Sequence, residues 1–222
     1  MKLSVIVPTF NESDTIIKTL EQVLKQKQVS EVIVVDDGST DQTNSQFKNI
    51  KNPKLKIVVH EKNLGKGAAV RSGIEKASGD YLIIQDADLE YDPSQFEILT
   101  RHASPAKAIY GSRLMAKNDY AYLHTLLGNM FLTSTFNLLF GQNLTDSYTC
   151  YKLIPTKIAR TLDLKSNGFE IEAEITAKLA EKGIKIIEVP IKYTPRGYKQ
   201  GKKIKAIDAL KGFLTYLQIR FS

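Results

Sequence analysis

The sequence predicts an α/β fold in which a mostly parallel sheet is flanked by helices on both faces. Short runs rich in β-branched residues are largely apolar rather than alternating, as in strands that are buried on both faces. Segments with a 3.6-residue apolar period separate these runs, and strands that alternate with helices form parallel sheets. With 222 residues, of which 42% are hydrophobic, the chain can bury such a core without a metal or a disulfide.

Five apolar runs in the first half are predicted strands: Leu3–Val7, Glu31–Val35, Leu55–Val59, Tyr81–Ile84 and Ala106–Tyr110. Helices are predicted between them at Asp14–Gln26, at Gly67–Ala77 and from Pro93, which stands at the favoured first helical position.

The second half is less regular. Tyr122–Phe140 is rich in apolar residues but is too polar for a membrane-spanning helix, which needs about 20 mostly apolar residues. Further strands are predicted at Thr149–Ile154 and Ile184–Tyr193, with a helix at about residues 170–181 between them.

Composition narrows the class of protein. The single cysteine, Cys150, excludes a disulfide framework and a cysteine-based zinc site, and the three histidines are widely spaced. Pro8 ends the first apolar run too early for a secretory signal, so we expect a cytoplasmic protein.

The net charge of +7 is concentrated at the end of the chain, where residues 196–222 hold seven basic residues and one acid. Ile207, Leu210 and Leu214 belong to an apolar stripe in this segment, which predicts a basic amphipathic helix. Such a helix can lie on an anionic membrane surface, or it can pack onto the domain. Nucleic-acid binding is not expected, because aromatic platforms and recognition motifs are absent.

Three polar clusters follow predicted strands: Thr9–Glu12, Asp36–Ser39 and Asp86–Glu90. Ligands of open parallel sheets bind beyond the carboxyl ends of the strands, so the sequence places the site there.

Within the third cluster, Asp86 and Asp88 can approach one hard cation, with Glu90 as a further oxygen ligand. Mg²⁺ prefers one or two carboxylates together with substrate phosphates. An acidic loop without a metal is the alternative, since short motifs also match by chance.

The second cluster and a further stretch, Asn63–Gly67, point to a nucleotide. A carboxylate at Asp37 can accept a hydrogen bond from a ribose or base, although a capping turn would have the same sequence. Asn63–Gly67 opens a helix and offers backbone N–H groups and Lys66 to a phosphate.

Together these stretches resemble the glycosyltransferase family 2 enzymes of the Rossmann-like GT-A fold, most closely the dolichyl-phosphate mannose synthase and polyprenyl-phosphate glycosyltransferase branch. The matching stretches are VPTFNE (7–12), VVDDGSTD (34–41), NLGKGAAVRSG (63–73), DADLEYDP (86–93), YGSR (110–113), TDSYTCYK (145–152) and PIKYTPRGYKQGKKI (190–204).

The resemblance implies a nucleotide-diphosphate sugar donor, either GDP- or UDP-linked, a divalent cation (Mg²⁺ or Mn²⁺) and inversion at the anomeric carbon. The implied donor-binding residues are Pro8, Thr9, Phe10, Glu12, Val35, Asp37, Lys66, Asp86, Ala87 and Asp88. The implied metal ligands are Asp86, Asp88 and Glu90, with Asp88 the most direct.

Two acceptors remain open. For a polyprenyl phosphate, the resemblance implies that Arg113 and Arg196, with Ser112 and Lys202 nearby, position an anion that needs no base. For a sugar hydroxyl a base is required, and Asp146 is the candidate, although it could instead be a turn residue. Of the carboxylates at residues 170, 172 and 174, we expect at least two to be solvated.

The sequence therefore predicts a metal-dependent glycosyltransferase that is peripheral at the inner face of the membrane. We expect a GT-A domain over residues 1–195, with a donor and metal half (1–113) and an acceptor half (114–195), and then the basic tail (196–222). A nucleotidyltransferase would need a glycine- and arginine-rich stretch after the first strand, and a non-catalytic module would not need the metal acids.

Overall fold

The computed structural model of the chain describes residues 1–47, 50–119, 122–197, 203 and 205–222. Its strands are β1 (Leu3–Thr9), β2 (Val29–Asp36), β3 (Leu55–Val59), β4 (Tyr81–Ile84), β5 (Lys107–Ser112), β6 (Lys152–Pro155) and β7 (Lys185–Pro190). Its helices are α1 (Ile16–Leu24), α2 (Thr43–Phe47), α3 (Lys66–Lys76), the 3-10 turn η1 (Pro93–Gln95), α4 (Phe96–Arg101), α5 (Leu123–Phe140), α6 (Thr156–Arg160), α7 (Ile171–Glu181) and α8 (Ala206–Phe221).

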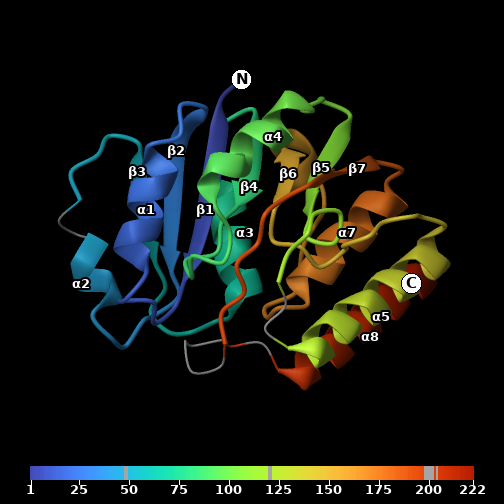
Figure 1. Cartoon of the computed structure of the whole chain (residues 1–222). Coiled ribbons are helices and arrows are strands. Elements are labelled where there is room, and N and C mark those ends of the chain that lie inside the picture. The colour runs from blue at the N-terminus through green and yellow to red at the C-terminus, as the bar shows by residue number, and fades with distance from the viewer. Residues whose placement is uncertain (48–49, 120–121, 198–202, 204) are drawn as a thin grey trace.

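The described strands form one seven-stranded sheet in the order β3-β2-β1-β4-β6-β5-β7 (Figure 1). β1 to β4 are mutually parallel, and β5 is parallel to β7. Only β6, among these strands, is antiparallel to its neighbours β4 and β5. The predicted mostly parallel α/β sheet is therefore confirmed.

The core follows from the apolar runs. The side chains of β1 are buried along its whole length, and those of β2 almost so, because helices cover both faces of the sheet. α1 lies in front of the sheet and α3 behind it (Figure 1), and α1 buries Ile16, Leu20 and Val23 at helical spacing. The two short helices α2 and α6 were not predicted, since five residues are too few to display a period.

The strand register brings the predicted polar clusters to one edge of the sheet, at the bottom of Figure 1. Thr9 at the end of β1 pairs with Asp36 at the end of β2, and the Asp37 backbone N–H donates to the Thr9 carbonyl at 2.8 Å. β4 ends beside β1, with Ile84 opposite Ile6.

The last helix, α8, packs against α5 and α7 (Figure 1). Its buried face includes Gly212 and Tyr216, and the Tyr216 hydroxyl donates to Ser147 Oγ at 3.1 Å. The predicted amphipathic helix is therefore docked on the domain.

A second apolar surface on these helices remains exposed, and we call it the α5–α8 face. It consists of Leu123, Leu127, Met130, Phe131 and Leu138 of α5 with Ile207, Leu210, Leu214 and Phe221 of α8. No helix in the described part of the chain has both the length and the hydrophobicity to cross a bilayer.

Candidate active site

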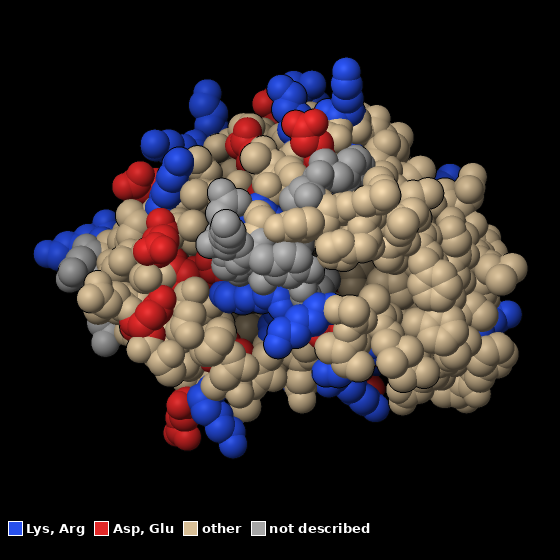
Figure 2. All heavy atoms as spheres, turned by 60° about the horizontal axis from the view of Figure 1, so that its bottom comes forward, with Lys and Arg blue, Asp and Glu red and all other residues tan. Residues whose placement is uncertain are grey.

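A pocket of about 540 Å³ lies beyond the carboxyl ends of the strands. It brings together most of the predicted site residues: Pro8, Thr9, Phe10, Glu12, Asp37, Lys66, Asp86, Ala87, Asp88, Glu90, Arg113 and Arg196. Acidic and basic side chains lie side by side around the centre of this surface (Figure 2). The pocket thus lies at the sheet edge where the polar clusters are predicted to meet.

The two aspartates that follow β4 line the pocket from a strained turn, in which Leu89 has a φ of 62°. Lys66 Nζ lies 2.7 Å from Asp86 Oδ1, and the Glu90 backbone N–H donates to Asp88 Oδ1 at 3.1 Å. Burial, and then repulsion from the Asp86 and Glu90 carboxylates, raises the pKa of Asp88 to about 7. A cation bound beside Asp86 and Asp88 would relieve this repulsion and favour the ionised form of Asp88.

Glu90 holds the segment of residues 193–196, which we call the strap. The Tyr193 hydroxyl donates to Glu90 Oε2 at 2.6 Å, and the Arg196 backbone N–H donates to Oε1 at 2.8 Å. The Thr194 backbone N–H donates to the Glu90 carbonyl at 2.9 Å. Both carboxylate oxygens of Glu90 thus accept hydrogen bonds from the strap and fix its position over the pocket.

The strap brings Arg196 to the carboxylates. Its guanidinium lies 2.9 Å from Glu12 Oε1 and 3.3 Å from Asp88 Oδ2, and Lys203 Nζ lies 2.7 Å from Glu12 Oε1. Burial raises the pKa of Glu12, but hydrogen bonds from Arg196 and Lys203 outweigh it, so this pKa lies below its ordinary value. Lys203 was missed as a site residue, because a basic tail gives no sign of which of its cations folds back. Tyr193 was missed as well, because an isolated tyrosine near the end of a predicted strand carries no distinguishing signal.

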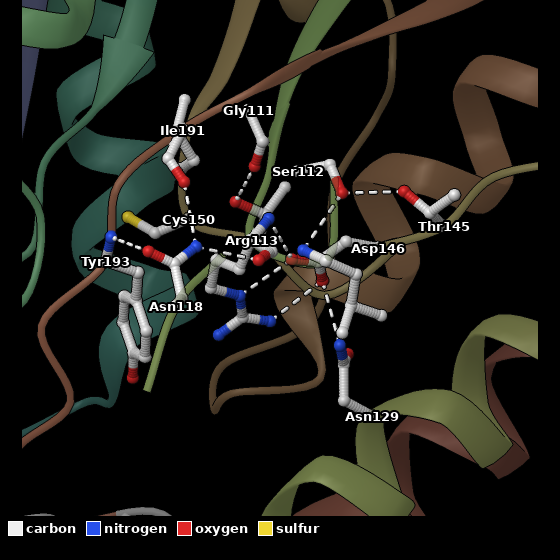
Figure 3. A network of polar contacts seen from close by, with 12 residues as sticks. Gly111, Ser112, Arg113, Asn118, Asn129, Thr145, Asp146, Cys150, Ile191 and Tyr193 are labelled. Carbon is white, nitrogen blue, oxygen red and sulfur yellow. Dashed lines mark hydrogen bonds and ion pairs between the residues drawn. The ribbon is translucent and has the colours of Figure 1, made fainter. Parts of the chain in front are cut away.

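Arg113 is fixed in orientation by Asp146 (Figure 3). Its Nε donates to Asp146 Oδ2 at 2.7 Å and its Nη2 to Oδ1 at 2.8 Å, while Asn129 Nδ2 also donates to Oδ1 at 3.0 Å. Asp146 is fully buried, and burial raises its pKa, but Arg113 outweighs burial and lowers it. Asp146 therefore holds a guanidinium whose carbon lies 5.2 Å from the Tyr193 ring centroid.

Asp37 connects the loops that follow β2 and β3. Its carboxylate accepts the backbone N–H groups of Leu64 at 3.0 Å and Gly65 at 2.7 Å, and it lies 2.7 Å from His60 Nδ1. Gly65 has a φ of 99°, a conformation that favours glycine. These contacts place the amino-terminal end of α3, and with it Lys66, at the pocket wall.

Not all the predicted residues reach the pocket. Val35 is fully buried in β2, because a central strand is covered on both faces, and it does not line the cavity. Ser112 is also buried, where it accepts the backbone N–H groups of Leu114 and Met115, and it lies behind the pocket lining. Lys202 lies outside the described residues.

The expectation for the carboxylates of α7 was wrong. Glu172 and Glu174 are 3% and 4% exposed rather than solvated. Glu174 accepts the backbone N–H groups of Lys165 and Ser166, which order the loop before the helix. Glu172 lines the pocket. Three acids at alternate positions gave no sign of these partners, which lie elsewhere in the sequence.

The acids fit a divalent cation that is bound together with a ligand. No group of three or more His, Cys, Asp or Glu side chains within the described ranges could by itself hold a metal. Asp86 and Asp88 nevertheless supply the hard oxygen donors that Mg²⁺ and Mn²⁺ prefer, and Mg²⁺ is usually held by one or two carboxylates with substrate phosphates.

Comparison with known proteins identifies relatives of this chain. The chain is 31% identical over 202 residues to a low-salt glycan biosynthesis hexosyltransferase of Haloferax volcanii, covering 87% of this chain and 48% of that protein. It thus spans about half the length of that relative. It is 27% identical to an undecaprenyl-phosphate mannosyltransferase of Micrococcus luteus, covering 91% and 87% of the two chains.

Among solved structures, glucosyl-3-phosphoglycerate synthase of Mycobacterium tuberculosis shares the fold. Its complex with Mn²⁺, UDP and phosphoglyceric acid superimposes with a TM-score of 0.74 at 18% identity, covering 99% of this chain and 78% of that one. The family model for glycosyl transferase family 2 matches residues 4–162. The resemblance seen in the sequence is therefore confirmed, and the chain is a glycosyltransferase that belongs to glycosyl transferase family 2.

Proposed function

We propose that this glycosyltransferase is inverting and metal-dependent and moves a hexose from GDP-mannose or a UDP-hexose to a polyprenyl phosphate. The observation that carries the proposal is the pocket itself, which Asp86 and Asp88 line together with Arg113 and Arg196. Acids can hold a cation with the donor diphosphate, and the arginines can hold a second anion. The undecaprenyl-phosphate mannosyltransferase relative supports this acceptor.

On the donor side, Asp86 and Asp88 would hold Mg²⁺ or Mn²⁺. When bound, such a cation stabilises the negative charge that develops on a departing nucleoside diphosphate. Lys66, which contacts Asp86, offers an ammonium group to a phosphate oxygen, and Phe10, which also lines the pocket, offers an aromatic ring for contact with the base. The related solved structure with bound Mn²⁺ and UDP supports this arrangement.

On the acceptor side, the state of Asp146 favours a phosphate over a sugar hydroxyl. A general base must reach the proton that it removes, but Asp146 is fully buried and both its oxygens accept hydrogen bonds from Arg113. Its lowered pKa makes it a weak base. A phosphate is already anionic and needs only cations to orient it, which Arg113 and Arg196 supply.

The α5–α8 face supports a membrane location for such an acceptor. Exposed apolar side chains cover the two adjacent helices. The right-hand side of Figure 2 is almost uniformly tan, which means that few charged residues lie there. Lys205, Lys211 and Arg220 on α8 or at its start are exposed as well. An apolar surface bordered by cations suits the headgroup region of an anionic bilayer. We propose that the protein is peripheral there, at the inner face.

The test is a transfer assay with labelled GDP-mannose, UDP-glucose and related donors, with and without undecaprenyl phosphate in detergent. We expect a lipid-soluble labelled product that requires Mg²⁺ or Mn²⁺. Asp88→Asn should lower kcat/KM by about 10²-fold or more, because a group that stabilises transition-state charge is removed. Exposed Asp14 provides the matched control, Asp14→Asn. Transfer to saccharides but not to the lipid phosphate would refute the acceptor.

The membrane contact is tested separately by sedimentation with vesicles that contain anionic lipid. Leu127→Ser combined with Leu214→Ser, both at exposed positions, should release the protein from the vesicles. Each exposed leucine that inserts is worth about 1–3 kcal/mol, so a loss of binding of about tenfold or more is expected. Equal sedimentation of the variant and the wild type would refute the proposed contact.

A further inference from the structure

Lys66 is shared between two carboxylates that come from different elements. Its Nζ lies 2.7 Å from Asp86 Oδ1, after β4, and 3.0 Å from Glu172 Oε1, on α7. The Lys66 side chain is 13% exposed, so it is largely removed from water. The ammonium group therefore lies between a predicted metal ligand and a second carboxylate that also lines the pocket.

Glu172 is held in place from the side opposite the pocket. Lys152 Nζ donates to Glu172 Oε2 and to the Thr149 carbonyl, and it lies 5.1 Å from the Tyr110 ring centroid. Lys152 is fully buried, so it has no water to replace these partners. Burial raises the pKa of Glu172, but Lys152 and Lys66 outweigh burial and lower it. Glu172 is thus held as a carboxylate between two ammonium groups, and we call Glu172 and Lys152 the anchor pair.

These contacts form a buried row of alternating charge: Lys152, Glu172, Lys66 and Asp86. A divalent cation that binds Asp86 competes directly with the Lys66 ammonium for the same carboxylate. If Asp86 were the only partner of Lys66, this competition would leave a largely buried ammonium unpaired, which is costly. Because Glu172 also binds it, Lys66 can release Asp86 and stay at the pocket wall.

We infer that Glu172 is a positioning residue that keeps Lys66 at the donor diphosphate when a cation takes Asp86. The inference rests on the proposed function. This arrangement favours joint binding of the cation and the nucleotide. The row of four side chains is already neutral, so a cation alone adds positive charge, and the negative charge of the diphosphate then balances it. Without Glu172, Lys66 would bind Asp86 alone and compete more strongly with the cation.

The test is a set of Mn²⁺ titrations, followed by the paramagnetic resonance signal of free Mn²⁺, with and without UDP or GDP. Lys66→Met should bind Mn²⁺ more tightly without nucleotide and should lose most of the enhancement that nucleotide gives. The double variant Glu172→Gln/Lys152→Met removes both charges of the anchor pair, and it should weaken nucleotide-free Mn²⁺ binding by about fivefold. Lys76→Met, at the exposed far end of α3, controls for net charge.

The decisive comparison is the triple variant Lys66→Met/Glu172→Gln/Lys152→Met. If Glu172 acts through Lys66, the triple variant should match Lys66→Met alone. If substituting Glu172 and Lys152 weakens Mn²⁺ binding equally with and without Lys66, the role of Glu172 is structural. That result would overturn the inference but not the proposed function. Failure of the wild type to bind Mn²⁺ with either nucleotide would overturn the proposed function as well.

A second, conservative variant keeps the inference testable if the double variant of the anchor pair does not fold. Glu172→Asp retains the charge but withdraws the carboxylate by one methylene from Lys66. It should raise the donor KM more than it lowers kcat, whereas a purely structural defect would lower the melting temperature without this division. An unchanged donor KM in a folded Glu172→Asp variant would overturn the inference.

Discussion

Replacing Glu31 should remove a pH-dependent part of the stability. Glu31 is 5% exposed, and its carboxylate accepts hydrogen bonds from Ser4, Lys56 and the backbone N–H of Ser78. Burial raises its pKa, but these hydrogen bonds outweigh burial and lower the pKa from 4.5 to about 2. The ionised form therefore stabilises the fold.

The size of the effect follows from the two pKa values. Each pH unit between the folded and unfolded pKa is worth about 1.4 kcal/mol, which gives about 3 kcal/mol as an upper value. Lys56 is 48% exposed, so solvent weakens its contribution, and we expect about 2 kcal/mol. Because the folded pKa is depressed, this stability is present above pH 4.5 and is lost as the pH falls toward 2.

Urea unfolding of the wild type and Glu31→Gln, followed by circular dichroism, measures this difference. The free energy of unfolding should differ by about 2 kcal/mol at pH 7, and the gap should narrow as the pH is lowered to about 3. Glu61→Gln, at an exposed position, is the control and should show little change at either pH. A gap for Glu31→Gln that is constant over this range would refute the electrostatic reasoning.

Two further predictions concern the strap and α8. Tyr193→Phe removes a hydroxyl that donates to Glu90 at 2.6 Å, so the acceptor KM should rise about tenfold in a transfer assay; an unchanged KM would mean that this contact does not position the strap. A Cβ at Gly212 would lie 2.0 Å from the Tyr148 hydroxyl, so Gly212→Ala should cost about 1–3 kcal/mol in thermal melts. Gly128→Ala, in open space on α5, should stabilise slightly, and equal effects of the two would contradict the packing argument.

Much of the fold could be predicted because apolar runs and helical periods are local signals. Leu3–Val7, apart from Ser4, and Tyr81–Ile84 form apolar runs, and they became neighbouring central strands. The antiparallel direction of β6 could not be predicted, since a short buried strand reads the same in either direction.

The location of the site could also be predicted from the sequence, but the contacts between its side chains could not. Polar clusters at the ends of parallel strands must converge, so the positions of Glu12, Asp37 and Asp86 follow from topology. Which side chain pairs with which acid depends on the course of the loops. Glu90, for example, accepts a hydrogen bond from Tyr193 of the strap, which lies 103 positions later in the sequence. The burial of Glu172 depends likewise on Lys152, which comes from another element.

The strap is synthesised late, so the central strands of the sheet can fold before the contacts between the strap and the pocket carboxylates form. Glu12 and Arg196 are 184 positions apart, so Glu12 emerges from the ribosome long before Arg196 is synthesised. Because domains generally fold from the amino-terminal side during synthesis, the central strands can assemble first. The carboxylates of Glu12 and Asp88 would thus gain their arginine partner only after residues 193–196 have been made and have folded back.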